Sequence, residues 1–357
     1  MFVHGRKSGC RITLDYTYRG LPVAYLENDA LAVGVLTGKG GDIIELTYKP
    51  RDVDFLWHSP IEPRSPFVST VPQAEGAFHD YYFGGWQEVL PSAGWSDEPY
   101  QGAQQGLHGE LALLPLNARV LEDSAGEVVL ELSTRLYRSP LSLVRRMSLR
   151  DNVPALFIDE TLRNEADQEF AVMWGHHPAV GAPFLDESCV VSAPASRVDV
   201  LDFHPNGLWE RGEGFAYPLV PSRRSGEPED IRRVRPPGTR SADVLRLTGL
   251  AAGWYGLTSQ RLGVGLGMAW DAQVFPELWM WQGYRGHDDY PWFGRAYNLA
   301  LEPHTSWPPS GVANAVRNGT ARVLGPGEVV ETSLVAVGYE AESISAVHPD
   351  GSVEKGS

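Results

Sequence analysis

The sequence predicts an all-β fold, a large antiparallel β-sandwich, and three observations lead to this expectation. Short stretches of alternating or β-branched apolar residues recur along almost the whole chain. Turn residues separate these stretches at intervals close to the roughly 8–12 residues typical of sandwich folds. No apolar pattern of helical period extends beyond about two turns, which disfavours a helical or βαβ architecture.

The first expected element is a hairpin over residues 30–48, in which two apolar runs flank the turn "GKGG". This turn lacks the spacing of a phosphate-binding loop and the helix that would follow one, so we interpret it as a hairpin turn. Further strands are expected at residues 127–137, 141–150, 155–164, 169–177, 244–250, 261–270, 278–284, 297–303, 320–326 and 328–339.

We expect a single domain over residues 1–357, with its core at about residues 20–342. No repeat and no linker of distinct composition divides the chain. Residues 221–241 form the most irregular segment, with six arginines among prolines and glycines. We interpret this segment as a long surface loop, and less favourably as a domain boundary, because strands of the same kind continue on both sides.

The composition limits the partners of the protein. A net charge of −15 argues against a nucleic-acid or anionic-membrane partner, because binding to phosphates depends on lysine and arginine. The two cysteines, Cys10 and Cys189, are expected to be free thiols, with a single disulfide as the alternative. Since neither a secretion signal nor an apolar run of the roughly 20 residues of a membrane span is present, we expect a cytoplasmic protein.

Three residues are candidates for proton transfer. Glu302 ends an apolar strand, where desolvation favours a carboxyl group that acts as a base near neutral pH. His177 precedes a proline and is expected at a strand end, where its ring can donate a hydrogen bond. His108 lies beside a glycine that allows a ligand to approach. The alternatives are a surface ion pair for Glu302, a packed ring for His177 and a turn for His108.

Tryptophans suggest a sugar ligand, because sugar rings present apolar faces with hydroxyl groups at their edges. Trp279 and Trp281 share one face of an expected strand, because side chains alternate with a period of two. Gln282 follows them and is a candidate for hydrogen bonds to a sugar. By the same alternation His176 and His177 point to opposite faces, so that His176 packs, or lines the cleft edge if Pro178 bends the strand.

These stretches together resemble the aldose 1-epimerase, or galactose mutarotase-like, superfamily, and in particular its divergent bacterial branches. The resemblance lies in "LAVGVLTGKGGDIIELTY", "LHGE", "GHHPAV", "LALEP" and "LGPGEVVETSLVAVGY", which follow the order of that family over about residues 30–340. It implies the mutarotase-like form of the β-sandwich, known as a supersandwich. It also implies a small-molecule sugar substrate and a reaction that requires neither a metal nor a cofactor.

The resemblance further implies roles for individual residues. Glu302 would remove the proton of the anomeric hydroxyl, His177 would protonate the ring oxygen, and His108 would bind and polarise the same region. The sequence "GGWQE" stands where the family has a sugar-binding arginine. Trp86, Gln87 and Glu88 are therefore expected to contact the sugar in its place.

Two other functions remain open at this stage. A metal-assisted carbohydrate isomerase, lyase or deglycosidase could use ligands chosen from His108, Glu110, His176, His177, Glu302 and His304. Strand alternation disfavours this hypothesis, because His176 and His177 cannot easily bind one ion. A non-catalytic carbohydrate-binding module is the third possibility, although binding alone does not require an acid and a base.

Overall fold

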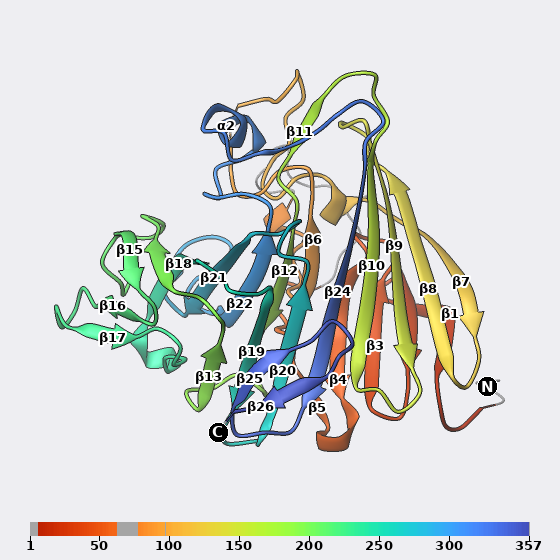
Figure 1. Ribbon diagram of the computed structural model, residues 1–357, viewed down its shortest axis with the longest axis horizontal. Helices are drawn as coiled ribbons and strands as arrows, with labels where there is room; N and C mark the ends of the chain where they lie inside the picture. Colours follow the sequence, from red (N-terminus) through yellow and green to blue (C-terminus); the bar gives the residue numbers. More distant parts are fainter. Residues whose placement is uncertain (1–5, 63–77, 97, 357) are drawn as a thin grey trace.

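The computed structural model describes residues 6–62, 78–96 and 98–356 and confirms the all-β expectation. Two large antiparallel sheets pack face to face (Figure 1). Among the described residues, no helix is long and apolar enough to cross a membrane. Both cysteines, Cys10 and Cys189, are free and buried.

The first sheet contains twelve strands of the described chain. In spatial order they are β1 (Arg11–Tyr18), β2 (Leu21–Glu27), β3 (Leu31–Leu36), β4 (Asp42–Tyr48), β6 (Trp86–Val89), β12 (Gly175–Val180), β22 (Tyr297–His304), β21 (Glu277–Tyr284), β18 (Ser241–Thr248), β14 (Arg197–Val200) and β15 (Gly212–Ala216), with β5 (Val53–Asp54) paired to β4. The central strands β6, β12, β22 and β21 carry most of the residues discussed below.

The second sheet contains eight strands of the described chain. In spatial order they are β13 (Cys189–Ser192), β19 (Trp254–Ser259), β20 (Val264–Trp270), β24 (Val329–Tyr339), β10 (Ala155–Asn164), β9 (Leu141–Arg150), β8 (Glu127–Arg135) and β7 (Asn117–Asp123). Figure 1 shows its long strands β8, β9, β10 and β24 side by side.

Smaller elements complete the described chain. Three two-stranded sheets pair β11 (Phe170–Val172) with β23 (Arg322–Leu324), β16 (Leu219–Pro221) with β17 (Pro228–Asp230), and β25 (Ile344–Val347) with β26 (Val353–Lys355). The helical elements are α2 (Val312–Arg317) and the 3₁₀ turns η1 (Lys49–Arg51), η2 (Leu111–Leu113) and η3 (Pro237–Thr239).

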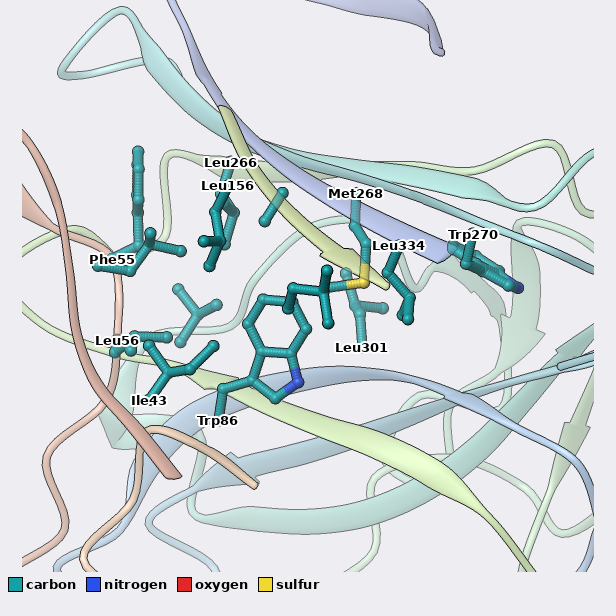
Figure 2. Close-up of a cluster of buried hydrophobic side chains, with 14 of the residues drawn as sticks. Ile43, Phe55, Leu56, Trp86, Leu156, Leu266, Met268, Trp270, Leu301 and Leu334 are labelled. Atoms are coloured by element: carbon teal, nitrogen blue, oxygen red, sulfur yellow. The ribbon is translucent and has the colours of Figure 1, made fainter. Parts of the chain in front are cut away.

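The core lies between the two large sheets, because their strands alternate apolar and polar residues and turn the apolar ones inward. One cluster of buried side chains includes residues of both sheets. Figure 2 shows Trp86 and Leu301 of the first sheet near Leu156, Met268 and Leu334 of the second. The opposite face of the first sheet is therefore available for a ligand site.

The strand predictions agree closely with the structure where alternation is clear. Residues 141–150 and 155–164 coincide with β9 and β10. The hairpin expected over residues 30–48 is β3–β4, and the buried Lys39 of its turn pairs with Asp42 at 2.5 Å. The single strand expected over residues 169–177 is instead two strands, β11 and β12, which belong to different sheets.

The segment expected to be a long loop, residues 221–241, contains short elements of its own. β17 pairs with β16 as a small hairpin, and the 3₁₀ turn η3 precedes β18. Figure 1 shows this region beside β15, at the left end of the molecule. The segment therefore continues the chain between two strands of the first sheet, β15 and β18.

Candidate functional site

A cavity of about 450 Å³ lies on the face of the first sheet that points away from the second sheet. Aromatic side chains form much of its wall, and Glu302 and His177 also line it. The aromatic residues of the lining are Phe78, Tyr82, Trp95, Phe203, Trp279, Trp281, Tyr290 and Trp292. A concave, largely apolar site with a few polar groups is typical of small-molecule pockets.

Strand register brings the two predicted proton-transfer residues together. On β12 and β22, Gly175 pairs with His304 and Ala179 pairs with Ala300. His177 therefore lies opposite Glu302, and the His177 Nε2 atom is 3.6 Å from Glu302 Oε1. Glu302 is 2% exposed and His177 is 5% exposed. The sheet thus holds an acid–base pair at the floor of the cavity.

A second imidazole fixes the other oxygen of Glu302. His304 is two residues further along β22 and so points to the same face. Its Nε2 lies 3.2 Å from Glu302 Oε2, and its ring stacks on Trp279 at 3.7 Å between centroids. Gly175 makes this possible, because a Cβ atom there would be 2.0 Å from His304 Nδ1.

Loop residues hold the far side of the His177 ring. The Tyr82 hydroxyl lies 3.3 Å from His177 Nδ1. The centroid of the His108 ring lies 5.4 Å from that of the His177 ring. The backbone of His108 is left-handed, with φ of 59°. The Gly94 amide donates to His108 Nδ1 at 3.3 Å, so the ring proton of neutral His108 is on Nε2.

Burial determines the protonation of these groups, because it disfavours whichever form is charged. It raises the pKa of Glu302 well above its ordinary value. It lowers the pKa of His177 to about 4, and it lowers the pKa values of His108 and His304 well below their ordinary range. In the free protein the favoured form of the pair is therefore a neutral acid beside a neutral imidazole.

Sequence comparison assigns the chain to a family. A family model described as "Domain of unknown function (DUF4432)" matches residues 18–336. The chain belongs to the DUF4432 family. Among curated proteins, none matches this DUF4432 chain in sequence.

Solved structures of other proteins share the fold of the DUF4432 chain. One, from Klebsiella pneumoniae, is described as a candidate aldose 1-epimerase; its TM-score is 0.71 at 15% identity, over 93% of this chain and 83% of that one. A galactose mutarotase-like protein from Clostridium acetobutylicum has a TM-score of 0.62 at 12% identity, over 93% of this chain and 99% of that one. A candidate aldose 1-epimerase from Escherichia coli K12 has a TM-score of 0.59 at 15% identity, over 93% and 100%. These similarities confirm the galactose mutarotase-like β-sandwich.

Of the residues predicted from the sequence of this DUF4432 protein, five line the cavity: His108, His177, Trp279, Trp281 and Glu302. The other five, Trp86, Gln87, Glu88, His176 and Gln282, are buried away from it and are not carried into the proposed site. Gln87 lies on the same face as His177, but its side chain turns to the Gly84 carbonyl. Gln282 accepts a hydrogen bond from the Trp209 indole at 2.7 Å.

Trp86, Glu88 and His176 point into the core because they lie on the opposite face of β6 and β12 from His177. There His176 Nε2 lies 3.0 Å from Glu160 on β10, and the Trp86 indole donates to His176 Nδ1 at 3.1 Å. Since an indole N–H can only donate, His176 carries its proton on Nε2 and donates it to Glu160. These residues therefore join the two sheets.

Two of the six ligands considered for a metal site, Glu110 and His176, lie apart from the others. His176 and His177 face opposite sides of β12, and Glu110 accepts hydrogen bonds from the amides of Tyr137 and Arg138. In the part of the chain that the structure describes, no group of three or more histidine, cysteine, aspartate or glutamate residues is arranged to hold a metal ion.

Sequence reasoning did not single out three residues of the site. Tyr82 comes from a loop, and nothing in its local sequence indicates that it contacts His177. His287 lines the cavity and accepts a hydrogen bond from the Trp281 indole at 3.1 Å. His304 was considered only as a metal ligand, although its spacing of two from Glu302 on a strand does predict a shared face.

Proposed function

We propose that the protein is a sugar epimerase that interconverts the α and β anomers of an aldose without a cofactor. The observation that supports this most strongly is the buried pair of Glu302 and His177, 3.6 Å apart on the floor of an aromatic cavity. Ring opening of a pyranose requires one group to remove a proton from the C1 hydroxyl and another to protonate the ring oxygen. A carboxyl group and an imidazole side by side meet this requirement.

The walls of the cavity suit a sugar. Trp279 and Trp281 offer flat apolar faces to the C–H side of a pyranose ring. His108 and the Tyr82 hydroxyl lie beside them and can form hydrogen bonds with hydroxyl groups. Structures that share the fold are described as galactose mutarotase-like proteins and candidate aldose 1-epimerases, which agrees with this choice of ligand.

One proton passes through each group as the ring opens. The step begins after the proton of Glu302 has passed to His177, which leaves a carboxylate beside an imidazolium. Glu302 takes the proton of the C1 hydroxyl, His177 gives its proton to the ring oxygen, and the bond between C1 and that oxygen breaks to leave an aldehyde. The pair ends as carboxylic acid and imidazole, which is the form that burial favours.

Rotation about the C1–C2 bond then presents the other face of the aldehyde, and the reverse transfers close the ring as the other anomer. His304 stays bonded to Glu302 throughout, because its Nε2–H can donate to Oε2 both when Glu302 is a carboxylate and when the other oxygen, Oε1, carries the proton. Tyr82 holds the Nδ1 side of His177 and leaves Nε2 directed toward Glu302. His108 polarises the region around the reacting oxygens.

We further propose that the two sheets act as one domain, since a single buried cluster includes strands of both. We also place the reaction in the cytoplasm, where thiols such as Cys10 and Cys189 stay reduced.

Replacement of the base tests the proposal. Glu302→Gln keeps the size of the side chain but cannot accept the proton, so the rate of anomer exchange should fall by roughly 10²–10⁴-fold. His177→Asn should cause a similar loss. The rate is measured by polarimetry or NMR, starting from pure anomers of a panel of aldoses. Glu331→Gln, an exposed glutamate on β24, is the matched control and should retain full activity.

The outcomes separate the competing functions. Full activity in Glu302→Gln contradicts the mechanism. If the wild-type protein binds an aldose tightly but accelerates none, it is a carbohydrate-binding module. A stoichiometric transition metal in the purified protein, found by elemental analysis, favours the metal-assisted alternative.

A further inference from the structure

The cavity has a buried floor and an exposed rim. Trp279 on the floor is 2% exposed, whereas Trp95, Phe203 and Tyr290, which line the same cavity, are 37%, 44% and 47% exposed. These three residues lie outside the strands of the first sheet, on separate loops. The ring-opening chemistry uses only the floor, so the aromatic rim has no part in it.

Polar groups accompany the aromatic rings of the rim. Asp202 and His204 flank Phe203 in the chain, and both line the cavity. The backbone amide of Asn206 donates to His204 Nδ1 at 3.2 Å, so neutral His204 carries its proton on Nε2 as a donor. The His287 ring lies 5.1 Å from that of His204, and it is bonded to the Trp281 indole of the floor. The rim thus combines aromatic faces with directed hydrogen-bonding groups, as the floor does, and this combination suits a sugar ring.

We propose that the rim is a second sugar subsite and that the substrate is a reducing disaccharide or a longer reducing oligosaccharide. This inference rests on the proposed function. The anomeric carbon must reach Glu302, which is buried at the floor, so the reducing ring enters first. The next ring, attached away from C1, then lies against Trp95 and Phe203. A cavity of about 450 Å³ is within the range of roughly 300–1,000 Å³ found for pockets that take drug-sized ligands.

Comparison of disaccharides with their component monosaccharides tests the second subsite. Maltose, cellobiose and lactose are compared with glucose and galactose as substrates for anomer exchange. We expect kcat/KM for the preferred disaccharide to exceed that of its reducing monosaccharide by at least about tenfold. Phe203→Ala and Trp95→Ala should each lower the disaccharide value roughly tenfold, mainly through KM, because they remove binding that is equal in ground and transition states. Their effect on the monosaccharide should stay within about twofold.

Phe293→Ala is the matched control, because Phe293 is also an exposed aromatic residue, at 60%, but does not line the cavity. This variant should leave kcat/KM unchanged for both disaccharides and monosaccharides. Equal kcat/KM for disaccharides and monosaccharides, with no selective effect of Phe203→Ala, would overturn the subsite while leaving the epimerase proposal intact.

Calorimetric measurement of sugar binding separates the failure of the epimerase proposal from the failure of the second subsite. If the wild-type protein accelerates no aldose, the epimerase proposal fails, and binding of the same sugars then decides about the subsite. Tighter binding of a disaccharide that Phe203→Ala abolishes supports the subsite. Equal binding of both classes, or binding of neither, overturns it.

Discussion

At the scale of single residues, Glu302 is held more firmly than an acid at a strand end usually is. His304 contacts one of its oxygens and His177 approaches the other. The ring of Trp279 stacks on the ring of His304. Gly175 leaves the space that His304 fills. In the proposed reaction, a carboxyl group fixed in this way would already be oriented toward the sugar, which lowers the entropic cost of the reaction.

The pH dependence of the proposed anomer exchange should follow from the protonation of His177 and Glu302. We expect a bell-shaped profile of kcat/KM, because the pair must hold one proton in total. The acid limb should lie near pH 4, where His177 becomes protonated while Glu302 is already protonated and no base remains. The alkaline limb should lie above the ordinary range of a carboxyl group, because the pKa of Glu302 is raised.

Initial rates from a pure anomer, measured from about pH 3 to about pH 9 and corrected for the buffer reaction, give this profile. The residual activity of His177→Asn should not show the limb near pH 4, but should rise with pH through the raised pKa of Glu302, because only the ionised carboxyl group can then act as the base. An acid limb near the ordinary histidine value of about 6.5 would contradict the assignment.

At the scale of elements, buried charges connect the two sheets behind the site. Arg145 on β9 pairs with Glu160 at 2.9 Å, with Glu88 on β6, and with the Gly41 carbonyl at 3.0 Å. Burial raises the pKa of Glu88, although Arg145 opposes this, whereas His176 and Arg145 outweigh burial at Glu160 and lower its pKa. One cation thus faces two carboxyl groups, and Glu88 is the one that gains a proton more readily.

Removal of that cation should destabilise the sandwich. Arg145→Met leaves Glu88 and Glu160 buried without their partner, and should lower the free energy of unfolding by about 3–5 kcal/mol. Arg146→Met is the control on the next residue of β9, where an exposed pair with Glu131 contributes at most about 1 kcal/mol. Urea unfolding of both variants measures the difference. Equal losses would show that the buried network contributes no more than a surface ion pair.

The sequence predicted strands well where apolar residues alternate, as in β9 and β10, because the pattern itself marks the buried face. It also predicted that His176 and His177 point to opposite faces. It could not predict that Trp86, Gln87 and Glu88 lie away from the cavity, because that depends on pairing with β12, far away in the sequence. The split between β11 and β12 was missed for the same reason, since only their different partners separate them.

At the scale of the whole molecule, the sandwich keeps several neutral histidines inside. Burial lowers the pKa values of His79, His177 and His287 to about 4. The unfolded chain binds protons at these residues near pH 6.5, and the folded chain does not do so until about pH 4. Their contribution to stability is therefore complete above pH 6.5 and is lost as the pH falls toward 4.

The contribution of these three histidines to stability should consequently decrease in mild acid. Each of the three imidazoles contributes a slope of up to about 1.4 kcal/mol per pH unit between about pH 6.5 and pH 4. His58 acts in the opposite direction, because its bond to Asp54 raises its pKa. The buried carboxyl groups of Glu302, Glu88 and Asp243 also oppose the three histidines, because burial raises their pKa values and the folded chain holds their protons more tightly than the unfolded chain does. Denaturant unfolding at several pH values gives the slope of the free energy of unfolding against pH. His287→Gln should reduce this slope by the contribution of one proton, up to about 1.4 kcal/mol per pH unit. An unchanged slope in His287→Gln would contradict the burial of a neutral imidazole at this position.

The opposite orientation of His176 and His177 has a consequence for variation in this chain. Strand β12 separates the cavity from the core between the two sheets, so neighbouring residues serve different ends. Substitutions at 176 should reduce the amount of folded protein in a cell, and those at 177 should spare abundance while removing catalysis. Scans of all substitutions at these two positions would thus give two different phenotypes, loss of folded protein at 176 and loss of activity at 177.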